Sequence, residues 1–141
     1  MSVDRVFIDT NVLVYAFDES EPAKQRRARA VLVDLDDAVV STQVLQELYV
    51  ALTRGRGGVK PKLDQPSAER AVATTAELTV VVVDVPMIVK GMHRAGRDKL
   101  SLWDALIVEA ALTAGCRRLL SEDFQDQRRF DDLVVVNPLA R

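Results

Sequence analysis

The chain has 141 residues, a formal net charge of −2, 48% hydrophobic residues and 28% charged residues. This composition is that of a globular domain with a sizeable core, and it excludes a disordered or collagen-like chain. The small net charge gives no general attraction to nucleic acid, so any such binding must come from local patches. No apolar run approaches the ~18 residues of a membrane span. We therefore expect one cytoplasmic domain over residues 1–141 with no membrane association, and the single Cys116 is expected to be a buried thiol.

The first predicted element is an apolar strand at residues 6–8, which is followed directly by Asp9. Three large apolar residues in a row are typical of a strand buried on both faces at the centre of a parallel sheet. Ligands of open α/β sheets bind at the carboxyl ends of such strands, where Asp9 would lie. Asp is also a good helix cap, and an apolar helix is expected to follow. Asp9 alone is therefore compatible with a site residue and with a cap.

The second acid of interest is Glu47. Helices are predicted at 22–35 and, capped by Ser41 or Thr42, through about Arg54, with a short strand at 38–40 between them. Glu47 lies beside the apolar stripe of the later helix. On this helix alone, an ordinary exposed glutamate is the simpler interpretation.

A glycine-rich basic segment follows that helix. It holds three glycines, one proline and four basic residues, namely Arg54, Arg56, Lys60 and Lys62. Two interpretations are open, a solvated linker and a mobile loop that contacts the phosphates of RNA.

The middle of the chain continues the alternation of helices and strands. A helix is predicted at 67–78 with Ser67 as its N-cap, followed by a strand at 79–83. The strand is rich in β-branched residues, which predicts an interior position in the sheet. A further helix is expected over 86–95.

Asp104 is the most informative acid. The run 101–108 opens a helix that is apolar nearly all round and is therefore expected to be buried, where a charge is costly without compensation. Ser101 and Asp104 have the spacing of a capping box, which explains an acid there but not the flanking Trp103. We favour a functional role for Asp104, whereas Glu109 on the same helix is predicted to face solvent.

The last part of the chain predicts two more strands, at 118–120 and 133–136. The first ends in Ser121-Glu122-Asp123, another strand end followed by acids. Residues 126–132 are mixed in charge and are expected to form a surface loop. Five strands are predicted in total.

Four motifs together resemble a PIN domain, and within that family the VapC-type toxins of bacterial toxin–antitoxin pairs. The motifs are short and lie in the family's order along essentially the whole chain: Phe7-Ile8-Asp9-Thr10-Asn11, Gln46-Glu47-Leu48, Leu102-Trp103-Asp104-Ala105 and Leu120-Ser121-Glu122-Asp123. The resemblance implies a three-layer α/β/α sandwich with a central, mostly parallel, five-stranded sheet. It also implies a metal-dependent ribonuclease whose acidic positions carry over onto Asp9, Glu47, Asp104 and Asp123.

The chemistry of carboxylates agrees with that implication. Clustered like charges repel one another, and bound Mg²⁺ or Mn²⁺ removes the repulsion because these hard cations prefer oxygen ligands. On this basis Asp9 and Asp104 are the principal ligands, and Asp123 completes the site. Glu47 binds the metal directly or through water, or orients the nucleophile. Thr10 and Ser121 support the ligands from behind.

The resemblance also implies an antitoxin protein as partner, beside the RNA substrate, and we expect a homodimer. A partner arginine could pair with the acidic pocket and exclude the metal. An amphipathic partner helix could bind apolar residues of the helices after the first and second strands, although any one of them could equally be core: Leu13, Tyr15, Phe17 and Tyr49.

Three other functions are weighed against the nuclease. A haloacid-dehalogenase-type phosphatase needs a second Asp where this chain has Asn11. A receiver-type signalling domain needs an acid pair after the first strand, where the chain has Asp9 and Thr10. A catalytically silent PIN-like protein that binds RNA or acts as a scaffold keeps the fold, but the presence of all four acids argues against it.

Overall fold

Strands and helices alternate along the chain in the computed structural model, which describes residues 4–55 and 57–140. The strands of these residues are β1 (Val6–Ile8), β2 (Ala38–Ser41), β3 (Thr79–Val81), β4 (Arg118–Leu120), β5 (Arg129–Phe130) and β6 (Leu133–Val136). The helices are α1 (Thr10–Ala16), α2 (Pro22–Val33), α3 (Thr42–Thr53), α4 (Gln65–Thr75), α5 (Val85–Asp98) and α6 (Leu102–Thr113).

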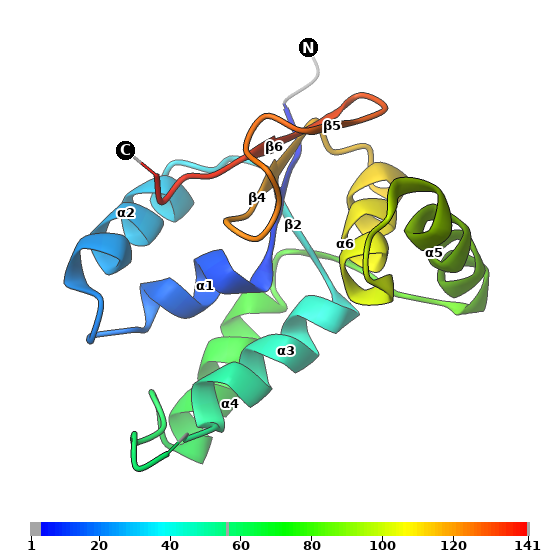
Figure 1. Ribbon diagram of the computed structural model, residues 1–141. Coiled ribbons are helices and arrows are strands. Elements are labelled where there is room, and N and C mark those ends of the chain that lie inside the picture. Colours follow the sequence, from blue (N-terminus) through cyan, green and yellow to red (C-terminus); the bar gives the residue numbers. More distant parts are fainter. Residues whose placement is uncertain (1–3, 56, 141) are drawn as a thin grey trace.

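The strands form one sheet in the order β3-β2-β1-β4-β6-β5, and every pair is parallel except β5 with β6. Figure 1 shows α5 and α6 on one side of this sheet and α2 on the other. The predicted α/β class, with a mostly parallel central sheet between helices, is therefore confirmed.

The sheet is built around β1, which pairs with β2 on one side and β4 on the other. Its three residues are each at most 1% exposed, as expected for a strand covered on both faces. From β1 the chain runs outward through β2 to β3 and then crosses back to β4. The strand order reverses between β1 and β4, and ligands of open α/β sheets bind outside the carboxyl ends at such a point.

Two predictions about the sheet are wrong. The sheet has six strands rather than five, because Arg129 and Phe130, which were assigned to a surface loop, pair antiparallel with β6 as β5. The strand predicted at 79–83 is an edge strand of three residues, because Val82 and Val83 leave the sheet and the Val83 N–H donates to Thr42 Oγ1 at 3.1 Å. β-Branched composition indicates a strand, but it does not indicate how many neighbours that strand has.

Two predictions about the helices also need correction. α4 begins at Gln65, not at Ser67. Its N-cap is Asp64 rather than Ser67, because the Asp64 carboxylate accepts a hydrogen bond from the Ser67 N–H. Glu109, predicted to face solvent, is only 13% exposed in its side chain and lies 3.5 Å from Arg94 Nε. The helix that supplies this arginine, α5, packs against the face of α6 that was taken to be open.

Arg94 joins three parts of the fold. Its side chain is 7% exposed and lies within ion-pair distance of Asp98 in its own helix, Glu109 in α6 and Asp131 in the β5–β6 turn. Its guanidinium also lies 6.0 Å from the centre of the Phe130 ring. A buried cation with three carboxylate neighbours cannot be removed without leaving buried negative charge unpaired.

Two further findings concern the chain as a whole. Cys116 is 3% exposed, as predicted, and burial raises the pKa of its thiol to about 11. Among the residues that the structure describes, no helix is both long and apolar enough to cross a membrane.

We predict that Arg94→Met lowers the free energy of unfolding by about 3 kcal/mol, because the largely buried Glu109 loses its counter-ion. Urea denaturation of the variant and the wild type measures the difference. Arg97→Met is the matched control on the same helix, since the Arg97 side chain is 65% exposed, and it should change stability by no more than about 0.5 kcal/mol. Equal stability of the two variants would contradict the role given to Arg94.

Candidate active site

Asp9 lies directly after the central strand β1 and is 5% exposed. Its carboxylate accepts hydrogen bonds from the Thr10 N–H at 2.8 Å and from Ser121 Oγ at 2.8 Å. The first bond caps α1, and the second joins the end of β1 to the end of β4. Asp9 therefore caps α1 and lies where the strand order reverses, and its role in a functional site stays a prediction.

Glu47 is connected to Asp9 through Thr10, the residue that follows Asp9 in the chain. Thr10 Oγ1 donates to Glu47 Oε1 at 2.7 Å, and Gln43 Nε2 donates to Glu47 Oε2 at 3.2 Å. Gln43 lies one turn earlier in α3, so the same helix supplies the acid and one of the groups that orients it. Glu47 is partly buried and is not the ordinary exposed glutamate of its helix alone.

Asp104 lies in the first turn of α6, whose N-cap is Ser101. Ser101 Oγ accepts from the Asp104 N–H at 3.1 Å, as the predicted capping arrangement requires. The Trp103 carbonyl accepts a hydrogen bond from Gln43 Nε2 at 3.1 Å, which ties this helix start to α3. The Trp103 side chain is 63% exposed, so it is not part of the core.

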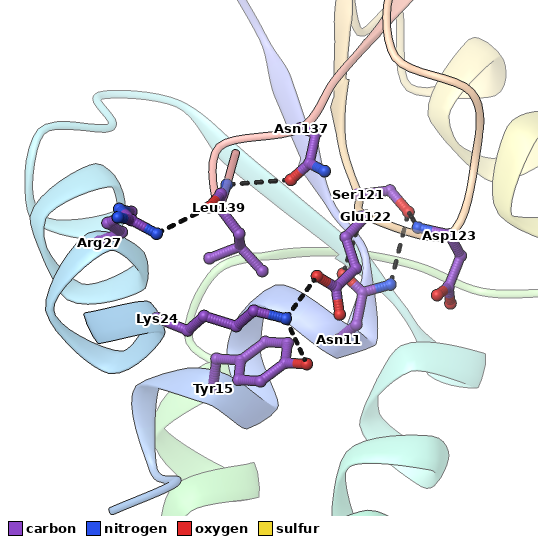
Figure 2. A network of polar contacts seen from close by, with 9 residues as sticks. All are labelled: Asn11, Tyr15, Lys24, Arg27, Ser121, Glu122, Asp123, Asn137 and Leu139. Carbon is purple, nitrogen blue, oxygen red and sulfur yellow. Dashed lines mark hydrogen bonds and ion pairs between the residues drawn. The ribbon is translucent and has the colours of Figure 1, made fainter. Parts of the chain in front are cut away.

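Asp123 and Glu122 follow β4, and their side chains point in different directions (Figure 2). Glu122 accepts a hydrogen bond from Lys24 Nζ at 3.3 Å, and Lys24 also donates to Tyr15 Oη at 3.2 Å. The Asp123 N–H donates to Ser121 Oγ at 3.1 Å, so Ser121 contacts both Asp9 and the backbone of Asp123. The Asp123 backbone is therefore linked to the Asp9 carboxylate through the Ser121 hydroxyl.

Burial and the charges of neighbouring acids shift the pKa values of Asp9 and Asp104. Burial raises the pKa of Asp9 from 3.8 to about 7, the hydrogen bonds from Ser121 and Thr10 oppose this shift, and the charges of Asp123 and Glu47 add to it. Partial burial also raises the pKa of Asp104, with Asp123 and Glu47 contributing again. Hydrogen bonds through Thr10, Ser121 and Gln43 connect the segments that carry the four predicted acids, so these segments lie close together.

The donor set of this region suits a hard divalent cation. Within residues 4–55 and 57–140, none of the four acids forms an ion pair with Lys or Arg, whereas neighbouring Glu122 pairs with Lys24. Clustered carboxylates without cationic partners fit Mg²⁺ or Mn²⁺. In that same part of the chain, no three acids are yet close enough to hold one ion together. The side chains would have to converge when a cation binds.

Two contributors were missed by the sequence analysis. Asn11 donates to Asp9 Oδ2 at 3.4 Å and its side-chain oxygen accepts from the Glu122 N–H at 3.2 Å, so it braces both strand ends. Gln43 bridges Glu47 and the Trp103 carbonyl. The spacing of Gln43 from Glu47, one helical turn, was visible in the sequence, but the contact with Trp103 depends on the packing of α3 against α6.

The basic segment after α3 lies beside this region. Arg54, Lys60 and Lys62 line a pocket of about 610 Å³ that also includes Glu47. Arg56, the fourth predicted RNA-binding residue, lies outside the described residues. The segment is therefore adjacent to Glu47, and RNA binding by it stays a prediction.

The chain has an α/β sheet with acids near the point where the strand order reverses. Its family is identified from the sequence. Residues 6–133 match the family model of the PIN domain. The chain therefore belongs to the PIN domain family. Comparison with curated protein sequences finds no significant match.

Solved structures show the same fold. One is a toxin–antitoxin complex from Klebsiella pneumoniae, with a TM-score of 0.71 and 18% identity over 94% of this chain and 97% of that chain. Another is VapC20 of Mycobacterium tuberculosis, a toxin that cleaves the sarcin-ricin loop, with a TM-score of 0.67 and 19% identity over 84% of this chain and 91% of that chain. FitAcB from Neisseria gonorrhoeae has a TM-score of 0.66 and 20% identity over 94% and 97%.

The raised pKa of Asp9 gives a prediction for the metal-free protein. The folded protein keeps the Asp9 carboxyl group protonated up to about pH 7, whereas the unfolded chain does so only up to about pH 4. Proton binding by Asp9 therefore stabilises the folded protein at low pH, and this stabilisation is lost as pH rises between these values. Asp9→Asn has no such titration. Its stability relative to the wild type should therefore rise over this range, by at most about 4 kcal/mol.

Urea denaturation in EDTA between pH 4 and pH 8 measures this difference, and Asp132→Asn is the control because Asp132 is exposed and outside the cluster. A stability difference between Asp9→Asn and the wild type that does not change with pH would contradict the assignment of a buried, proton-binding carboxyl group.

Proposed function

We propose that the protein is a metal-dependent endoribonuclease that acts in the cytoplasm as the toxin of a toxin–antitoxin pair. The observation that carries the proposal is the group of four acids without cationic partners where the strand order reverses. Two features of the structural relatives support it, since VapC20 is a toxin that cleaves RNA and the Klebsiella pneumoniae structure is a toxin–antitoxin complex.

In this proposal Asp9, Asp104 and Asp123 hold Mg²⁺ or Mn²⁺. The cation, when bound, activates a water for attack on the phosphodiester and offsets the charge that builds up on the phosphate. Ser121 holds the Asp9 carboxylate from behind, and Thr10 holds Glu47. Glu47 is then placed to bind the cation directly or through water, or to orient the attacking water. These hydrogen bonds orient the Asp9 and Glu47 carboxylates, and the other acids would move closer to them as the cation binds.

The difference in burial between the acids also helps to identify the kind of RNA that could bind. Asp9 is buried while Asp123 is exposed, so the acids extend from the interior to the surface. Single-stranded or looped RNA can bend its backbone toward a buried carboxylate more readily than a duplex can. We therefore propose unpaired RNA as the substrate.

We predict that the purified protein cleaves unpaired RNA with Mg²⁺ or Mn²⁺ and stops in EDTA. Asp9→Asn should abolish cleavage, with a loss of at least about a hundredfold, because a ligand charge is removed while the shape is kept. Gel analysis of end-labelled RNA measures cleavage, and circular dichroism confirms that the variant is folded. Asp132→Asn, an exposed acid outside the cluster, is the control and should retain activity.

Cleavage by the wild type in EDTA, or by Asp9→Asn at the control rate, would contradict metal-assisted hydrolysis. RNA binding without cleavage under any divalent cation would instead favour a catalytically silent PIN-like RNA-binding protein.

This chain has a groove near the acids that could bind the proposed antitoxin. A groove of about 580 Å³ between α3 and α4 is lined mainly by apolar side chains, among them Leu45, Tyr49 and Val72. It shares Gln46 and Val50 with the pocket that reaches Glu47, so a helix in the groove could direct an arginine to the acids. Of the residues first considered, Tyr49 lies here, whereas Leu13 is core at 6% exposure.

We predict that the antitoxin, sought as the product of a small reading frame directly upstream, inhibits cleavage and protects α3 and α4 from hydrogen exchange. Ala73→Glu places a charge in the groove at an exposed position and should weaken the complex at least about tenfold. Ala23→Glu on α2 is the control. Inhibition with protection confined to a surface remote from α3 would contradict the proposed docking. The homodimer stays a prediction, and light scattering of the purified protein tests it.

A further inference from the structure

The pocket that leads away from the acidic cluster changes in charge along its length. It begins at Glu47 and follows α3 to the end of that helix, and the segment after α3 forms its other wall. From Glu47 to Arg54 the helix axis advances about 10 Å. The lining residues are Gln46, Glu47, Val50, Ala51, Arg54, Val59, Lys60 and Lys62. An acidic end at the proposed catalytic centre is thus continuous with a basic end beside it.

The wall opposite α3 has a definite backbone path. A Cβ at Gly55 would lie 2.6 Å from the Val59 carbonyl oxygen, so only glycine allows the chain to pass so close to itself. Gly57 and Gly58 have φ angles of 50° and 83° and form the turn between these two points. The Leu63 N–H then donates to the Leu52 carbonyl at 3.0 Å, which joins the end of the segment back to α3. These contacts hold Val59 and Lys60 opposite the helix.

The cations of the pocket are available to a ligand. Arg54 and Lys60 are exposed, and in the part of the chain that the structure describes neither forms an ion pair. Lys62 lies 4.0 Å from Asp18, a long and weak pairing. The same pocket is also lined by the apolar side chains of Val50, Ala51 and Val59. The pocket therefore offers positive charge for phosphates and apolar surface for sugar or base.

We propose that this pocket binds the phosphodiester backbone of the RNA segment adjacent to the scissile phosphate, with Arg54 and Lys60 contacting its phosphates. The inference rests on the proposed ribonuclease function. Four carboxylates repel a polyanion, so the chain needs positive charge close to the acids to hold RNA there, and this pocket supplies it. An acidic protein segment is the competing ligand, and we favour RNA because the positive end is continuous with the centre where a phosphate must lie.

The test measures binding separately from cleavage. A fluorescently labelled oligouridylate is titrated with protein in EDTA at several KCl concentrations. Arg54→Ala/Lys60→Ala should weaken binding about tenfold. The slope of log Kd against log salt should become shallower by about 1.4, because each phosphate contact on a single strand contributes about 0.7. Arg26→Ala/Lys90→Ala removes the same charge from exposed positions on α2 and α5, and it should bind like the wild type.

The outcomes separate this inference from the proposed function. If the wild type cleaves RNA with Mn²⁺ but both double variants bind oligouridylate equally well and with equal slopes, the pocket is not an RNA subsite and the function stands. If the Arg54/Lys60 variant loses affinity for the antitoxin and keeps its affinity for RNA, the pocket binds a protein and the inference is wrong. If the wild type neither binds nor cleaves RNA with any divalent cation, the proposed function itself fails.

Discussion

The burial of carboxyl groups close to other carboxylates is the constraint on which the site depends. Asp9 is buried at the end of the central strand, where both burial and the charges of Asp123 and Glu47 disfavour its ionised form. A fold that only needed a helix cap there could use serine or threonine at no such cost. The chain instead surrounds the acids with neutral donors from Thr10, Asn11 and Ser121, which orient carboxylates without neutralising them. This arrangement leaves the negative charge free for a cation.

The surfaces proposed to bind RNA and the antitoxin lie side by side on α3. The groove between α3 and α4 and the basic pocket share Gln46 and Val50, and the pocket extends to Glu47. A partner helix that fills the groove would therefore lie against the path proposed for RNA. Inhibition could then arise from competition for α3 as well as from an arginine at the acids. One helix would supply a catalytic acid, a wall of the RNA path and a docking face.

The sequence predicted the strands and helices better than the contacts between them. Apolar runs located β1 and β4, because such runs depend on local periodicity. The pairing of β5, the edge position of β3 and the contact of Glu109 with Arg94 depend on which segments meet across the fold. Local sequence carries no such information. The same limit applied to Gln43, whose bond to the Trp103 carbonyl requires α3 and α6 to pack together.

Calorimetric titration of the metal-free protein with Mn²⁺ shows whether the acidic cluster is a divalent cation site. We predict saturable binding that is lost in both Asp9→Asn and Asp104→Asn, although these residues lie in different elements and are 95 positions apart in the chain. Glu122→Gln should keep the binding, because Glu122 pairs with Lys24 rather than with the cluster. Unchanged Mn²⁺ binding in the Asp9 and Asp104 variants would mean that these acids do not form a cation site.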